Sequence, residues 1–180
     1  MTLLPRRTAS INVSIPDLGM KIRAWKLLAP KAFDRGMEAG IRAATIDITA
    51  HTKNLLSGPV LNRRTHRLWK SIHPEVFRKR GRVIGIVGTD VKYAAIHEFG
   101  GTIRAKKEGN FLMFTVGGDV VRVREVEIPA RPFMSRAFEE RSDRVTTLVQ
   151  RHVMKAVKGV LESRTSLPPS QRIGVGFNAN

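Results

Sequence analysis

The sequence predicts an α+β fold in which an antiparallel sheet of about four to five strands packs on two long helices. Apolar residues recur at helical spacing over residues 30–56 and again over 132–161. Between these stretches lie short apolar runs bounded by turn residues, and strands grouped between helices are typical of the α+β class. The length of 180 residues fits one domain, which we place at residues 10–164 between an N-terminal arm (1–9) and a flexible C-terminal arm (165–180).

The N-terminal third predicts a strand, a short helix and a long helix. Residues 10–15 alternate Ile11, Val13 and Ile15 with polar side chains, which is typical of a half-buried strand. Residues 18–28 predict a short helix. Pro30 suits the first turn of the long helix, where its missing N–H costs nothing, and a Ser-Gly-Pro sequence at 57–59 ends that helix.

The remaining elements follow from turn residues. Apolar residues between 72 and 87 predict two strands joined by a basic turn at 79–81. Residues 93–99 predict one or two helical turns, closed by two glycines. A second hairpin is predicted from 111–116 and 120–128 around the turn at 117–119. Pro132 opens the second long helix, and after Arg164 the composition turns to Ser, Pro, Gly and Asn, with little to bury.

The charge predicts polyanionic partners. Lys and Arg number 32 against 15 Asp and Glu, which gives a net charge of +17 and a pI near 11.4. Such a field attracts nucleic acid, acidic protein surfaces or anionic membranes. The strongest candidate site is basic: Arg63, Arg64, Arg67, Lys70, Arg78, Lys79, Arg80 and Arg82. It is either a loop that follows phosphates or a solvated segment whose charge discourages sheet-edge pairing. Trp69 offers a ring for stacking on a base, but the interleaved aromatics of single-strand binders are missing.

The sequence does not support an enzyme. There is no cysteine, which removes disulfides, thiolate metal sites and cysteine nucleophiles. His97-Glu98 is half of a zincin motif without its second histidine. Two acidic pairs, 139–140 and 125 with 127, fit solvated surface better than acid–base dyads. We therefore expect no catalytic residue, metal or cofactor. We also expect no membrane span and no secretion signal, because no apolar run reaches the necessary length.

Two motifs resemble one family. The run Tyr93-Ala-Ala-Ile-His-Glu-Phe-Gly-Gly101, preceded by Gly-Thr-Asp at 88–90, is followed by Ile128-Pro-Ala-Arg-Pro-Phe133. In this order and spacing, the pair is similar to the tail-completion and virion-morphogenesis proteins of tailed bacteriophages, the Mu-like and lambda-like head-to-tail joining group. The segment from 56 to 72 resembles the part of those proteins that precedes the first hairpin, with His66 where they commonly carry glycine. The resemblance covers roughly residues 10–160.

The resemblance implies a structural virion protein. It would form a homo-oligomeric ring, expected to be a hexamer, at the head-proximal end of the tail, assembled in the host cytoplasm. The ring would bind the tail tube protein and the neck or connector proteins, with DNA passing through its centre. The alternative is a free-standing, basic, non-sequence-specific DNA-binding accessory protein. In the ring, the basic charge faces either the DNA or acidic neck and tail partners.

The motif residues are candidate subunit contacts or anchors. Phe99 is expected to be either a buried anchor or an intersubunit contact, and Arg131 to pair with Glu98 within or between subunits. The full candidate set is Tyr93, His97, Glu98, Phe99, Gly100, Gly101, Arg131 and Phe133.

Overall fold

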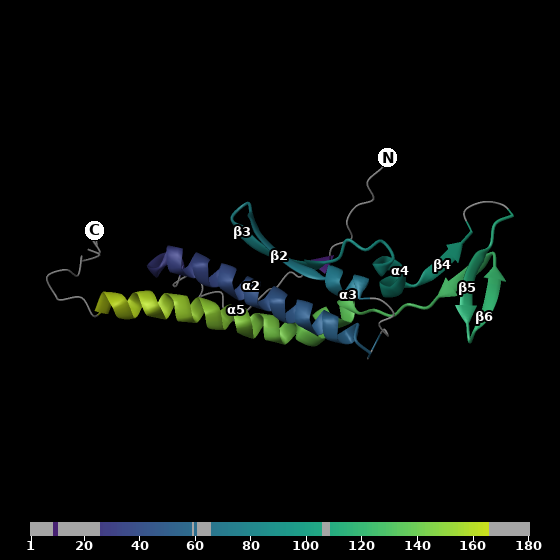
Figure 1. Ribbon diagram of the computed structural model, residues 1–180. Coiled ribbons are helices and arrows are strands. Elements are labelled where there is room, and N and C mark those ends of the chain that lie inside the picture. Colours follow the sequence, from purple (N-terminus) through teal and green to yellow (C-terminus); the bar gives the residue numbers. More distant parts are fainter. Residues whose placement is uncertain (1–8, 11–25, 59, 61–65, 106–108, 166–180) are drawn as a thin grey trace. The chain divides into compact units, whose positions relative to one another are not determined.

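The computed structural model describes residues 9–10, 26–58, 60, 66–105 and 109–165 (Figure 1). The helices are α2 (Pro30–Leu55), α3 (Arg67–Ser71), α4 (Ala94–Phe99) and α5 (Met134–Thr165). The strands are β1 (Ala9–Ser10), β2 (His73–Lys79), β3 (Arg82–Gly88), β4 (Gly101–Arg104), β5 (Leu112–Val116), β6 (Asp119–Val123) and β7 (Glu125–Ile128). The predicted α+β class is confirmed.

The strands form three small sheets, where the sequence predicted a single sheet of four to five strands. Their orders are β1-β3-β2, β4-β7 and β5-β6. β4 pairs antiparallel with β7, and β5 pairs antiparallel with β6. Each of these four strands pairs with one neighbour, and none of them is hydrogen-bonded to β1, β2 or β3. The predicted strand over 120–128 is interrupted by a bend at Arg124, which separates β6 from β7.

Contacts divide the chain into two compact units. The described part of unit 1 comprises β1 and residues 47–58, 60, 66–74, 86–105 and 109–141. The described part of unit 2 comprises residues 26–46, Glu75–Gly85 and residues 142–165. The single domain over 10–164 stays a prediction.

Unit 2 is built on a close helix pair. A side chain at Gly36 would place its Cβ 2.7 Å from the Cα of Val153, and one at Gly40 would meet the Cα of Val149 at the same distance. The missing side chains therefore let the first part of α2 and the last part of α5 approach backbone to backbone, running antiparallel. Around this contact the buried apolar core of unit 2 consists of Ala29, Ala32, Phe33, Val149, Val153 and Val157.

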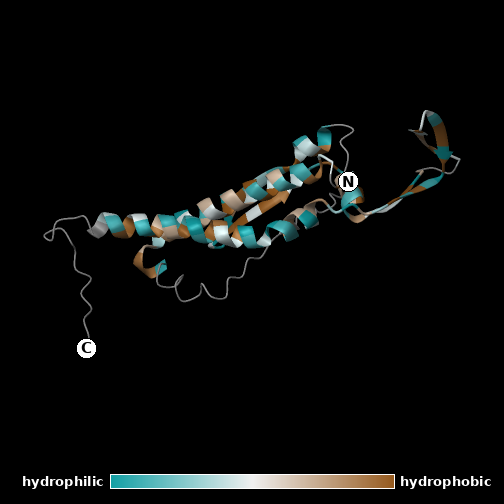
Figure 2. Cartoon of the chain, turned by 90° about the horizontal axis from the view of Figure 1, so that it is seen from below, coloured by the Kyte–Doolittle hydropathy of each residue, from teal (hydrophilic) through white to brown (hydrophobic). Residues whose placement is uncertain are grey.

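The same stretch of α2 contacts β3. At Gly85 a Cβ would come within 2.5 Å of the side chain of Thr45 and 2.8 Å of that of Ile41. Within unit 2, α2 thus packs on the strand and on α5, as the long apolar stripe from residue 30 predicted. In Figure 2 apolar residues recur along both long helices.

Several elements were not predicted, and some predictions cannot be compared with the structure. α3 lies in a segment interpreted as basic loop, and β4 follows directly on the glycines expected only to close α4. Of the predicted strand 10–15 only Ser10 is described, in β1, and of the helix 18–28 only residues 26–28, which are helical. Both predicted arms lie outside the described residues except for Ala9 and Thr165. No described helix is long and apolar enough to span a membrane.

Candidate functional site

The carboxylate of Glu98 caps the first turn of α5. Its Oε2 accepts hydrogen bonds from the backbone N–H of Phe133 (2.8 Å) and Met134 (2.9 Å). Its Oε1 accepts from the backbone N–H (2.8 Å) and the hydroxyl (2.7 Å) of Ser135. The first N–H groups of a helix have no partner within it, and negative charge is favoured there. Glu98 lies on α4 and is only 6% exposed. It therefore caps α5 from another helix, in the role that a residue directly before a helix usually has.

Backbone contacts join the same two segments. The N–H of Arg131 donates to the carbonyl of His97 at 2.7 Å. Gly100 has φ +69°, and a Cβ there would lie 2.8 Å from the backbone nitrogen of Ala130. Only glycine satisfies both the left-handed conformation and this close approach. The two sequence motifs, some thirty residues apart, thus form one structural piece, which we call the motif junction (residues 93–101 and 128–135).

The buried aromatic of the motif junction is Phe133, not Phe99. Phe133 is 0% exposed, whereas Phe99 is 57% exposed, so its interpretation as a buried anchor is wrong. The helical turn explains the difference. Ala94 and Glu98, four residues apart, share the inward face of α4, and Phe99 lies about 100° further round the helix.

The expected pairing of Arg131 with Glu98 is not formed within one chain, and a pairing between subunits stays a prediction. Both Glu98 oxygens are used by the start of α5, and within the described residues no ion pair joins the two side chains. Arg131 instead lies near His97. Partial burial and the charge of Arg131 lower the pKa of His97 below its usual 6.5, and the ring of Tyr93 meets His97 edge-on at 5.9 Å. At neutral pH this surface of α4 thus presents a neutral imidazole.

A two-stranded ribbon (residues 101–105 and 109–128) extends from the motif junction. Its inner part, β4-β7, carries the Arg104–Glu125 ion pair at 2.9 Å. Its outer part, the β5-β6 hairpin, places Leu112 opposite Val123 and Phe114 opposite Val121, on one face. Apolar side chains of the hairpin are exposed: Met113 by 64%, Val116 by 57% and Val120 by 66%. The sequence predicted this hairpin but not its exposure.

The predicted basic site is distributed over both units. Arg63 and Arg64 lie outside the described residues. Arg67 and Lys70 are exposed on α3 in unit 1, while the four basic residues at 78–82 belong to the β2-β3 turn in unit 2.

Arg78 of the basic segment and the ring of Trp69 both have partners within the chain. Arg78 pairs with Glu38 at 3.1 Å and with Asp34 at 3.8 Å, so its charge is partly neutralised by α2. The Nζ of Lys53 lies 4.8 Å from the centre of the Trp69 ring. It therefore covers one of the two ring faces on which a base could stack. Lys79, Arg80 and Arg82 at the β2-β3 turn are exposed, and so is Arg78 despite its ion pairs.

A polar cluster on the long helices was not predicted. The Nε2 of His51 on α2 contacts Glu140 of α5, whose other oxygen accepts from Arg136 at 2.7 Å. Arg141 reaches the His51 ring at 3.0 Å and Asp47 at 3.9 Å. Hydrogen bonds from Arg136 and His51 lower the pKa of Glu140. Both acidic pairs were interpreted as solvated surface, and only helix register, which brings 47–51 beside 136–141, would have predicted these contacts.

The described residues form an α+β fold, in which the motif junction connects α4 to the start of α5. Among the described residues, no group of three or more His, Asp or Glu is placed to hold a metal ion. A family profile described as the phage virion morphogenesis family matches residues 47–158, which include the whole motif junction and the ribbon. The chain therefore belongs to the phage virion morphogenesis family. No curated protein and no solved structure matches the chain.

Proposed function

We propose that the chain is the tail-completion subunit that joins the tail to the neck of the DNA-filled head. One observation carries the proposal: the family match covers both motifs, and the structure joins them into one capped junction. The most extensive contact among the motif residues is a helix cap, in which the buried Glu98 carboxylate binds the first turn of α5. Such a contact stabilises the fold, which fits a family of assembly proteins. A protein of this family acts during the building of the particle.

The subunit is proposed to form a closed ring, expected to be a hexamer. A ring arises when two different patches of one chain meet and the rotation closes. The ribbon, with two free strand edges and exposed apolar side chains, supplies such a patch. The tail tube and the neck or connector proteins would bind the two faces of the ring, with DNA passing through it.

The proposed function is tested by inactivating the gene in the phage. We expect DNA-filled heads and full-length tails that accumulate separately, and joining restored when the gene is supplied in trans. A heat-inactivated extract of the same complementing cells is the control for the restored joining. Complete, infectious particles formed without the protein would contradict the proposal and favour the DNA-binding accessory protein.

A further inference from the structure

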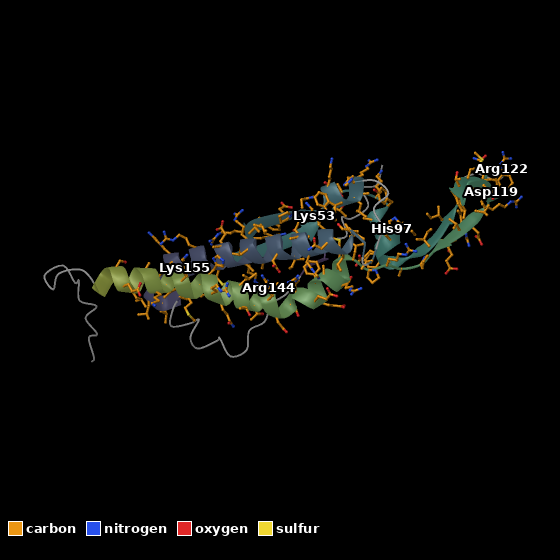
Figure 3. The ribbon with its side chains drawn as sticks, turned by 60° about the horizontal axis from the view of Figure 1, so that its bottom comes forward. Lys53, His97, Asp119, Arg122, Arg144 and Lys155 are labelled. Atoms are coloured by element: carbon orange, nitrogen blue, oxygen red, sulfur yellow. The ribbon has the colours of Figure 1, made fainter. Side chains whose placement is uncertain are left out.

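The outer hairpin of the ribbon exposes apolar side chains and carries no net charge. Residues 109–123 contain one acid, Asp119, and one base, Arg122, in a chain whose net charge is +17. Figure 3 shows both side chains at the far end of the hairpin. Exposed apolar groups of this extent mark interaction surfaces, and a two-stranded hairpin is only marginally stable until something packs on it.

A second surface of unit 1 is also without net positive charge. Between Tyr93 and Gly101 there is no Lys or Arg, and the single acid, Glu98, is buried as the cap of α5. This surface exposes two aromatic rings, Tyr93 by 39% and Phe99 by 57%. Aromatic side chains are enriched in the cores of protein interfaces.

The charge distribution favours a second copy of this chain as the occupant. Two copies of net charge +17 repel each other, so they can bind only where like charges do not face one another. The hairpin and the α4 surface meet this condition. A foreign acidic partner would instead be drawn to the basic remainder of the chain.

Two unpaired charges complement each other across such a contact. Within the described residues, Asp119 beside the hairpin turn and the side chain of Arg131 beside α4 make no ion pair, and both are exposed. The two lie on the two surfaces that the contact would bring together. An acid on one patch and a base on the other fix the orientation of a heterologous contact.

We propose that the β5-β6 hairpin of one copy packs on the Tyr93–Phe99 surface of the next copy, with Asp119 pairing with Arg131. The inference deepens the proposed function, on which it rests, by naming the contact that closes the ring. It uses two different patches of one chain, as a ring requires.

Cysteine crosslinking tests the contact, because the chain has no cysteine of its own. The variant pair Val120→Cys and Ala95→Cys places one thiol on the hairpin and one on α4. Mild oxidation of purified particles should give covalent multimers of the chain. The matched control combines Val120→Cys with Met154→Cys, an exposed position in unit 2, and should give none.

Two results overturn the inference. One is crosslinking of Val120→Cys only to other virion proteins, and the other is equal multimer formation in the control. The same oxidation is applied to the concentrated purified chain. If the protein is absent from particles, the proposed function fails, yet multimers of the purified chain still support the contact and their absence overturns it.

Charge exchange tests the ion pair separately. Asp119→Arg and Arg131→Asp should each lower the yield of crosslinked multimers at least tenfold, and the double variant should recover most of it. Both side chains are exposed, so neither change removes a buried group. Failure of the double variant to recover the yield, while each single variant folds normally by circular dichroism, overturns the pairing.

Discussion

Replacing Glu98 with alanine removes four hydrogen bonds from the start of α5. Three are donated by backbone N–H groups at 2.8–2.9 Å and one by the Ser135 hydroxyl at 2.7 Å. A buried donor left without a partner costs about 1–3 kcal/mol, and water entering the vacated space recovers part of that cost. Loss of a helix cap alone costs about 0.5–2 kcal/mol. We expect Glu98→Ala to lower the free energy of unfolding by about 3 kcal/mol, combining both effects.

Urea unfolding followed by circular dichroism measures this effect. With an m-value of about 2 kcal/mol/M, the midpoint should fall by about 1.5 M. Glu75→Ala, at an exposed position on β2, is the matched control and should change stability by less than about 0.5 kcal/mol. Equal midpoints for the two variants would refute the capping role. Glu98→Gln, which keeps one acceptor oxygen, should fall between the two.

Three further predictions concern packing and pH. Gly40→Ala should lower the free energy of unfolding by about 1–3 kcal/mol, because the new Cβ meets the α5 backbone. Gly159→Ala, whose Cβ meets nothing, should be neutral or stabilising by up to about 1 kcal/mol. Equal urea midpoints for the two variants would contradict the close contact at Gly40. Phe133→Ala should cost about 3–5 kcal/mol and Phe99→Ala less than about 1 kcal/mol, as thermal unfolding can measure; the reverse order would restore Phe99 as the anchor. The lowered pKa of His97 means that the unfolded chain binds its proton first, so its contribution to stability is complete above about pH 6.5 and is lost as the pH falls from there toward the lower folded pKa. Between pH 7.5 and 5.5, the free energy of unfolding should therefore fall less in His97→Gln than in the wild type. An equal fall in the two proteins would contradict the lowered pKa of His97.

The fold class could be predicted because periodicity and turn residues are local signals. The long helices and both hairpins follow from them, and α2 begins at the predicted Pro30. Division into three sheets could not be predicted, because strand pairing is non-local and depends on how the hairpin leaves α4. β4 was missed because its residues, Gly101–Arg104, include a glycine that suits a turn as well as a strand.

The candidate site was predicted as a set of residues but not as a geometry. The motifs identified the residues that the structure joins, since Glu98 and Phe133 both belong to the junction. Their roles depended on helix register: a shift of one residue along α4 exchanges a buried cap for an exposed ring. Charge counting could not predict the ion pairs of Arg78, because its partners Asp34 and Glu38 are about forty residues away in sequence.

Locating the protein in mature particles tests the proposed joining role most directly. Antibody-labelled electron microscopy of purified virions should place the label at the junction of head and tail, and the separate heads and tails of the gene-inactivated phage, which lack the protein, are the unlabelled control. Joined, infectious particles that carry the label elsewhere, or that contain none of the protein, would contradict the account.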